Sequence, residues 1–347
     1  MKSKKTIIIL IASILVVGIA LTVTLLLKKD NKKPNNNKNK EKEELKFPEE
    51  KKKLQIIDED SNSRPYAVMI NNINVARKAQ SGLSDAYIVY ELIVEGGITR
   101  YLALFKDAQT SRIGSVRSAR HYYLDYVLEN DAIYVHWGWS PQAQEDIRSL
   151  DIDNINGLSH DKYFFRSNPF KISSEHTGFT KMESLRAGAE KLKYKTTSEQ
   201  ENLLSYSIEP VNYENTVSAK KVDIKYSKAI TNNYMYNEET KTYLRSVNGK
   251  EQIDYNTSKQ LEVKNIIFYE VESYTIAGDE KGRQFLKNIG SGTGYYISEG
   301  AAVKINWSKK DRKSQTIYTL ENGDELKVND GNTFIQIVPT TGNIVME

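Results

Sequence analysis

The stretch AYIVYELIV, residues 86–94, decides the fold expected for this chain. It is a short apolar run, rich in β-branched and aromatic residues and bounded by polar turn residues, which is the pattern of a β-strand. Three further runs share this pattern: YAVMINN at 66–72, YLALF at 101–105 and AIYVHW at 132–137. Each of these runs is therefore predicted to be a strand of the same domain.

Two stretches of sequence, one between these strands and one after them, have the apolar periodicity of helices. Between residues 115 and 129 the apolar side chains recur every three or four positions, and a second such pattern covers 181–192. Strands and helices together predict a mixed α/β first domain over residues 64–208.

From residue 209 onward the pattern changes to short strands separated by turn dipeptides. The dipeptides Asn248-Gly249, Asn322-Gly323 and Asp330-Gly331 are typical of hairpin turns. Residues 209–347 are therefore predicted to form a second, mainly antiparallel β domain without a comparable helix, and the fold class is α+β. The strands expected in one curled sheet are 263–269, 295–297, 302–307, 315–318, 325–328 and 333–338.

The N-terminus has the pattern of a membrane anchor. Residues 6–27 are uncharged and rich in Ile, Leu and Val, long enough for the ~20 residues that cross a bilayer. Because the run is longer than the core of a cleavable signal, residues 1–27 are predicted to be a retained transmembrane signal anchor. Residues 28–63 are Lys-, Asn- and Glu-rich and are predicted to be a disordered charged tether, acting as a plain spacer or also touching anionic lipid.

The charge pattern leaves the orientation of this anchor open. Seven Lys lie between residues 28 and 42 and three lie before the apolar run, a count that places the body in the cytoplasm. A short basic tail before the first apolar segment is, in contrast, the normal beginning of a signal anchor whose body is exported.

The composition excludes several function classes. The chain has no Cys, so disulfides, thiolate nucleophiles, Cys-type zinc sites and a lipidated cysteine are excluded. Eleven Lys against six acidic residues in 28–53, together with the three Lys before the apolar run, account for more than the whole net charge of +4 and leave the folded part at about −4. A net acidic body argues against nucleic acid as a partner.

The segment RIGSVRSARH at 112–121 is the first candidate site. Three arginines and a histidine stand at the expected start of a helix, where cations are disfavoured unless an anion is bound. With Ser115 as N-cap, the residues Arg112, Arg117, Arg120 and His121 are predicted to bind phosphate or carboxylate. The alternative is structural, with the arginines paired to Glu91, Glu95 or Asp125 of the fold.

Two further patterns extend the candidate site. Glu91 and Glu95 lie on one face of a strand end, where a carboxylate pair performs acid/base work on a glycan or forms only an acidic turn. His136 and Trp139, in the sequence HWGW, make a ligand-lining lip or belong to the core. The following FFRSNPF at 164–170 is either a lid over that lip or a buried connection. No complete ligand set for a metal is recognisable, so no metal and no cofactor are predicted.

The sequence resembles the YerB family. The resemblance rests on RIGSVRSAR at 112–120, YE at 90–91 with GITR at 97–100, and the C-terminal run from YYIxxG at 295–300 to IQIVP at 335–339. Members are lipoproteins of Gram-positive bacteria with two consecutive domains of uncharacterised function, exported and held outside by a lipidated cysteine. This chain departs from the family in having no Cys. The resemblance implies an extracytoplasmic body and gives no reaction.

These observations together predict a membrane-anchored, extracytoplasmic binding or regulatory module of the cell envelope. Its partners are expected to be the membrane, an anionic cell-wall or lipid component, or a cell-wall synthesis protein. The alternative is an envelope hydrolase that acts on a glycan or a phosphoester. A hydrolase requires a pocket that holds a nucleophile or metal beside titratable groups, whereas a binding module requires only the arginines and an aromatic rim.

Overall fold

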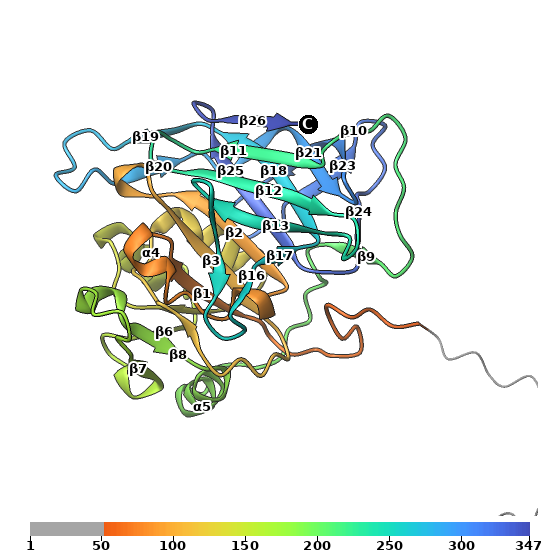
Figure 1. The fold of residues 1–347 in the computed structure, drawn as a ribbon. Coiled ribbons are helices and arrows are strands. Elements are labelled where there is room, and N and C mark those ends of the chain that lie inside the picture. Colours follow the sequence, from red (N-terminus) through yellow and green to blue (C-terminus); the bar gives the residue numbers. More distant parts are fainter. Residues whose placement is uncertain (1–51) are drawn as a thin grey trace, which may run out of the picture. The chain divides into compact units, whose positions relative to one another are not determined.

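An eleven-stranded mixed sheet forms the centre of residues 52–347, the part of the chain that this computed structural model describes (Figure 1). The first half of the sequence contributes five strands: β1 (Tyr66–Asn71), β2 (Ile88–Ile93), β3 (Thr99–Phe105), β5 (Ile133–His136) and β6 (Asn154–Asn156). The second half contributes β10 (Val217–Ser218), β18 (Asn265–Val271), β21 (Gly290–Ser298), β22 (Ala301–Lys309), β23 (Ile317–Leu320) and β25 (Thr333–Pro339). The strands predicted at 66–72, 86–94, 101–105 and 132–137 are confirmed.

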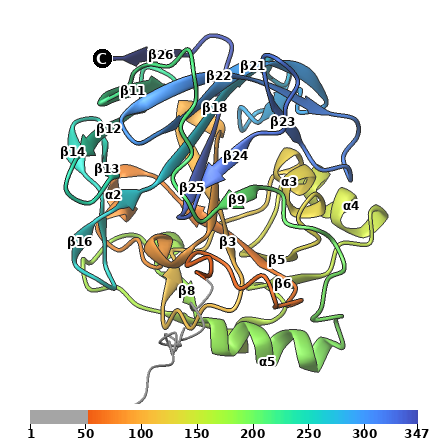
Figure 2. The same ribbon diagram turned by 90° about the vertical axis from the view of Figure 1, so that its right-hand side faces the viewer.

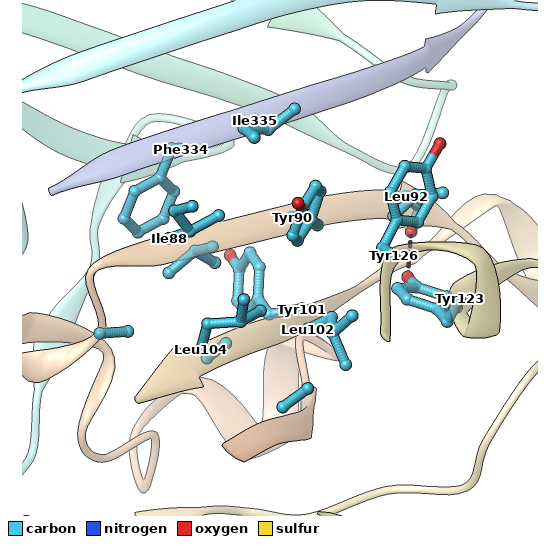
Figure 3. Close-up of a cluster of buried hydrophobic side chains, with 14 of the residues drawn as sticks. Ile88, Tyr90, Leu92, Tyr101, Leu102, Leu104, Tyr123, Tyr126, Phe334 and Ile335 are labelled. Atoms are coloured by element: carbon cyan, nitrogen blue, oxygen red, sulfur yellow. Dashed lines mark hydrogen bonds between the residues drawn. The ribbon is translucent and has the colours of Figure 1, made fainter. Parts of the chain in front are cut away.

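The strand β2 lies where the two halves of the sequence meet. It runs antiparallel to β3 on one side and parallel to β25 on the other, with Tyr90 opposite Leu102 and Ile335. All six of its residues are buried, because both faces of the sheet are covered at this point. Figure 3 shows the resulting cluster, in which side chains of β2, β3, β25 and the segment 123–126 pack together.

A second sheet of six strands covers one face of the large sheet (Figure 1). Its strands are β11 (Lys221–Lys225), β12 (Thr231–Asn237), β13 (Thr242–Val247), β14 (Lys250–Glu251), β17 (Glu262–Val263) and β26 (Asn343–Met346). Since side chains alternate along a strand, Glu91 points toward this second sheet and its neighbour Tyr90 points to the opposite face. Arg245 of β13 accordingly reaches Glu91, whereas Tyr90 packs against Tyr126.

Most of the short helices lie on the opposite side, but the one at residues 74–77 lies beside β14 (Figure 2). The α-helices of the described part are α2 (Asn74–Arg77), α3 (Leu124–Leu128), α4 (Pro141–Ser149) and α5 (Met182–Leu192). Single 3-10 turns are η1 (Leu83–Asp85), η2 (Glu95–Gly97), η3 (His121–Tyr123), η4 (Asp161–Tyr163) and η5 (Ser174–His176). The helix predicted at 181–192 is confirmed as α5, and residues 205–347 contain no helix, as expected for the β-rich half.

Four small sheets complete the described part. One has three strands, β4 (Ile113–Gly114), β8 (Gly178–Thr180) and β7 (Phe164–Arg166). The pairs are β15 (Ile253–Asp254) with β16 (Lys259–Gln260), β19 (Ser273–Thr275) with β20 (Gln284–Leu286), and β9 (Ser205–Ser207) with β24 (Lys327–Asn329).

The two predicted domains share one continuous sheet. Residues 52–347 form one compact unit, and the large sheet crosses the expected boundary at 208/209 through the pairing of β2 with β25. Buried or partly buried ion pairs also connect the halves, and in each the carboxylate comes from the first half and the cation from the second. These pairs are Glu91–Arg245 at 2.7 Å, Glu129–Lys309 at 2.7 Å and Asp125–Arg312 at 2.5 Å.

The sheet expected for the second half is only partly correct. Asn248-Gly249 does form the hairpin turn between β13 and β14, with positive φ at both residues, and Asn322-Gly323 also lies in a tight turn. The prediction for Asp330-Gly331 is wrong, because the strands on its two sides join different sheets. The prediction of one antiparallel sheet is also wrong. One of the expected strands, β24, lies in a small separate sheet, and β25 in the large sheet is parallel to both of its neighbours.

The end of the predicted tether differs from the expectation as well. Ile57 is buried, and the backbone N–H groups of Gln55 and Ile56 donate to the carboxylate of Asp330. The body therefore begins before residue 64, because a few apolar side chains are enough to hold this stretch against it. The predicted anchor, residues 1–27, and residues 28–51 of the predicted tether lie outside the described residues. Within 52–347 no helix has the length and apolarity to cross a membrane.

Candidate functional site

The arginine-rich segment is extended rather than helical. Helical structure begins only at η3 (His121–Tyr123), where Arg120 stands before the first turn. The N–H groups of Val116 and Arg117 donate to Gly178 and Met69, so neighbouring strands use the donors that an anion would need. The prediction of an anion site at a helix start is therefore wrong. Ser115, predicted as the N-cap, is fully buried and caps no helix.

Arg120 is engaged in an ion pair. Its Nε and second terminal nitrogen donate to both carboxylate oxygens of Glu95, at 2.5 and 2.9 Å, and Arg100 lies 3.8 Å from the same carboxylate. Burial opposes ionisation of Glu95, but the hydrogen bonds and charge of Arg120 outweigh burial and lower the pKa of this carboxyl. For Arg120 the structural alternative is the correct one.

Arg112 is also held by the fold. Its guanidinium lies 3.7 Å from the ring centre of Phe179 and 4.5 Å from that of Tyr255. It donates to the hydroxyls of Ser81 and Ser167 at 3.0 and 2.9 Å. The side chain thus stabilises the packing of the segment.

Glu91 is fully buried and has no access to a ligand. Its carboxylate accepts hydrogen bonds from Thr99 at 2.6 Å, from Asn232 at 2.8 Å and from Arg245 at 2.7 Å. Glu95 contacts the arginines described above instead. Of the two alternatives for this pair, acid/base work is not supported, because Glu91 pairs with Arg245 and Glu95 pairs separately with Arg120.

The two candidate histidines, His121 and His136, are both buried. Burial lowers the pKa of His121 to about 4, and the same cause lowers the pKa of His136 to about 4. Both rings are therefore neutral at pH 7. His136 lies under the lip, with Nδ1 2.8 Å from the carbonyl oxygen of Gly138 and its ring 5.7 Å from that of Trp139.

A hollow of about 400 Å³ brings the remaining two candidates, Arg117 and Trp139, together. We call it the Arg–Trp hollow. It lies where the end of β5 meets the extended arginine segment and the turn after β7. Its other lining side chains include Val116, Ser118, Trp137, Leu158, Arg166 and Glu175.

The backbone fixes the two main walls of the Arg–Trp hollow against each other. The N–H of Trp137 donates to the carbonyl of Arg117 at 2.9 Å, and the N–H of Ala119 donates to the carbonyl of Gly138 at 2.9 Å. The hydroxyl of Ser118 donates to the carbonyl of Trp137 at 3.0 Å. The arginine and both tryptophans are therefore held by a short ladder and not by a mobile loop.

Two glycines make room for the ring of Trp137. A Cβ added at Gly157 would come within 2.5 Å of this ring, and one added at Gly178 would come within 2.6 Å. The ring also contacts Phe164, whose ring centre lies 5.1 Å away. Trp137 is therefore tightly seated at the base of the hollow.

The charges of the Arg–Trp hollow are predominantly positive. Arg117 donates to the backbone carbonyl of Glu175 at 2.9 Å and lies 3.6 Å from its carboxylate. The Nε of Arg117 is buried and has no partner among residues 52–347. Arg166 is exposed and lies 4.6 Å over the ring of Trp137, where it donates to the carbonyl of Ser174 at 2.5 Å. Two cations and one exposed carboxylate leave a net positive rim around aromatic faces.

The sequence prediction missed Arg166 and Glu175. The stretch 164–170 was expected to be a lid or a buried connection, whereas its first residues form β7, which brings Arg166 to the rim. No spacing signal connects these residues to Arg117, because β4, β8 and β7 meet only in the folded chain. Within residues 52–347 no group of three His, Asp or Glu side chains gathers to hold a metal, and the prediction of no metal and no cofactor remains a prediction.

Comparison with known proteins places the chain in a family. Residues 54–195 match the family model described as "Protein of unknown function (DUF3048) N-terminal domain", and residues 222–335 match the corresponding C-terminal domain. The Bacillus subtilis (strain 168) protein named "Putative lipoprotein YerB" is 34% identical over 285 residues, which cover 80% of this chain and 81% of that protein. The crystal structure of the YerB protein from Bacillus subtilis has a TM-score of 0.71 and 31% sequence identity, covering 82% of this chain and 94% of that chain. The chain therefore belongs to the DUF3048 family, to which its resemblance to YerB pointed.

Proposed function

We propose that this protein is a binding module of the cell envelope. Residues 1–27 anchor it in the membrane, the body lies outside the cytoplasm, and the Arg–Trp hollow receives an anionic component of the envelope. The proposed ligand is a sugar ring that bears a carboxylate or a phosphate. A cell-wall synthesis protein is a further proposed partner, since such proteins also act at the outer face of the membrane.

The observation that carries this proposal is the union of Arg117, Arg166 and two tryptophans in one hollow. Aromatic faces suit the apolar face of a sugar ring, and guanidinium groups suit carboxylate and phosphate oxygens. Since Arg117 already contacts Glu175, the exposed Arg166 is the cation that a ligand would engage first.

The proposed location rests on the sequence and on the relative. The apolar run 6–27 supports the anchor, and the Bacillus subtilis relative is named as a lipoprotein. A spanning helix in place of a lipidated cysteine is consistent with the absence of Cys from the sequence. Protease added to intact wall-less cells should then digest the body, whereas a body on the cytoplasmic side would be cut only after lysis.

We prefer binding to hydrolysis because the lining of the hollow offers a single carboxylate, and this carboxylate already contacts Arg117. The only carboxylate among the lining residues given above, Glu175, lies beside Arg117 and 3.3 Å from Nε2 of His176. Nδ1 of His176 lies 3.0 Å from the side-chain amide of Asn71. Burial, followed by the charge of Arg117, lowers the pKa of His176, so a neutral ring faces Glu175. A hydrolase remains the alternative, and it would turn over its substrate in a manner that depends on Glu175.

The test is a titration of full-length protein with the muramic-acid disaccharide of peptidoglycan, glucose phosphate and their neutral analogues. We expect the anionic sugars to raise the melting temperature and the neutral analogues to have little effect, with the difference reduced by salt. Arg166→Gln should remove the effect. Arg148→Gln, an exposed arginine of α4, is the matched control and should leave it unchanged.

Equal stabilisation of wild type and Arg166→Gln would contradict binding in the hollow. Release of product from the disaccharide by wild type, together with its loss in Glu175→Gln, would establish the hydrolase instead.

A further inference from the structure

A second concave surface lies at the junction of the two halves, apart from the residues that line the Arg–Trp hollow. This groove has a volume of about 710 Å³ and lies between α2, the turn 168–172 and the β14–β15 connection. Figure 2 shows α2, β14 and β16 on one side of the molecule. We call it the basic groove. A ligand of this groove would bind independently of any ligand in the Arg–Trp hollow.

The walls of the basic groove are apolar and exposed. Val75, Phe170 and Ile253 have exposed fractions of 49%, 40% and 38%. They are three of the twelve large apolar side chains that are exposed in the described part of the chain. Tyr255 stands beside them, with its ring centre 6.0 Å from that of Phe170. Apolar side chains gathered in a concavity in this way are typical of a recognition surface.

The turn that presents Phe170 is held in place. The side-chain amide of Asn168 donates to the carbonyl of Ile172, and its oxygen accepts from the N–H of Ile172, both at 2.8 Å. The exposure of Phe170 is therefore built into the turn and costs little ordering entropy on binding.

Three cations surround this apolar surface. Arg77, Lys78 and Lys250 line the groove together with one carboxylate, Glu251, so the lining keeps a net positive charge. None of the three cations has a carboxylate within 4.0 Å among residues 52–347. Other cations of the body, such as Arg120 and Lys309, are paired. A ligand that is both apolar and anionic therefore complements this surface.

The backbone beside the groove is also available. The strand β14 (Lys250–Glu251) is the last of the six-stranded sheet and pairs only with β13. An unpaired strand edge can accept an extended chain by main-chain hydrogen bonds. A concave surface next to such an edge fits a peptide better than it fits the flat surface of a bilayer.

We propose that the basic groove binds an extended acidic segment of a partner protein. One apolar side chain of this segment enters between Val75, Phe170 and Ile253. Its carboxylates contact the surrounding cations, and its backbone pairs with β14.

The experiment selects a phage-displayed library of random dodecapeptides on full-length protein. Enriched peptides are synthesised with a fluorescent label and titrated by anisotropy. We expect them to combine at least two acidic residues with an apolar residue between them. Lys78→Glu combined with Lys250→Glu should weaken their binding by about tenfold or more. Lys281→Glu combined with Lys310→Glu changes the charge equally at exposed positions outside the groove and should leave binding unchanged.

The proposal is overturned if no peptide is enriched, if enriched peptides carry no acidic residue, or if the groove variant binds them as wild type does. It is also overturned if only short-chain phosphatidylglycerol, titrated in the same assay, binds wild type and not the groove variant. That result would assign the groove to lipid.

Discussion

Arg245→Met measures how much a buried ion pair between the two halves contributes to the stability of the body. Arg245 and Glu91 are both fully buried, and their 2.7 Å contact joins β13 of the second half to β2 of the first. Methionine keeps most of the side-chain volume but removes the charge. It also removes the hydrogen bonds that Arg245 donates to Tyr101 at 2.8 Å and to Tyr234 at 3.0 Å.

The expected loss of stability is large, because the substitution leaves a buried carboxylate without its cation. Removing one partner of a buried ion pair costs about 3–5 kcal/mol. Thr99 and Asn232 still donate to Glu91, so the lower end, about 3 kcal/mol, is expected. At roughly 2 °C per kcal/mol for a body of this size, the melting temperature should fall by about 6 °C.

The assay is urea denaturation of wild type, Arg245→Met, Glu91→Leu and the double variant. The double variant should recover most of the loss, since replacing a whole buried pair by apolar residues is often nearly neutral. A cost below about 1 kcal/mol for Arg245→Met, or separate unfolding of the two halves, would refute the reasoning.

Three further predictions concern Arg120, His121 and Gly178. Arg120→Ala should cost about 2–3 kcal/mol in urea denaturation, because Glu95 keeps only the more distant Arg100; a negligible cost would mean that the pair is not structural. His121 is neutral in the fold with a pKa of about 4, so its contribution to stability should be complete above about pH 6.5 and should decline by roughly 2 kcal/mol as the pH falls toward 4. His121→Gln should flatten that part of the stability profile, and an unchanged profile would contradict the assignment. Gly178→Ala should displace the ring of Trp137, shift its fluorescence and weaken binding of anionic sugars, whereas unchanged fluorescence and affinity would show that this ring is not tightly seated.

The strands of the first half could be predicted because their apolar runs are long and sharply bounded. The run at 86–94 is β2, whose burial on both faces leaves a continuous apolar pattern. A missed helix, α4, had a readable signal, since Ser140 accepts a hydrogen bond from Ala143 as N-cap and Pro141 opens the helix.

The pairing of strands could not be predicted from local pattern. The strand β25 reads as a member of the second half, yet it lies between β2 and β18 in the large sheet. Parallel pairing between distant segments depends on the global path of the chain, and no turn dipeptide marks it. The error at Asp330-Gly331 has the same origin.

The candidate site was predicted in part for a related reason. The arginine segment and the HWGW lip were each recognised, and the fold does bring Arg117 and Trp139 together. The functions of the other arginines depend on partners far along the chain, such as Glu95 for Arg120. Periodicity predicts a helix over 115–129, of which 121–128 is helical. At 115–120 pairing with neighbouring strands overrides the local pattern.

The most direct test of the proposed function is a crystal structure of the protein with the muramic-acid disaccharide. We expect the carboxylate of the sugar within hydrogen-bonding distance of Arg117 and Arg166 and one sugar ring against Trp137 or Trp139. A disaccharide bound elsewhere, or an empty Arg–Trp hollow at a concentration that saturates binding in solution, would contradict the account.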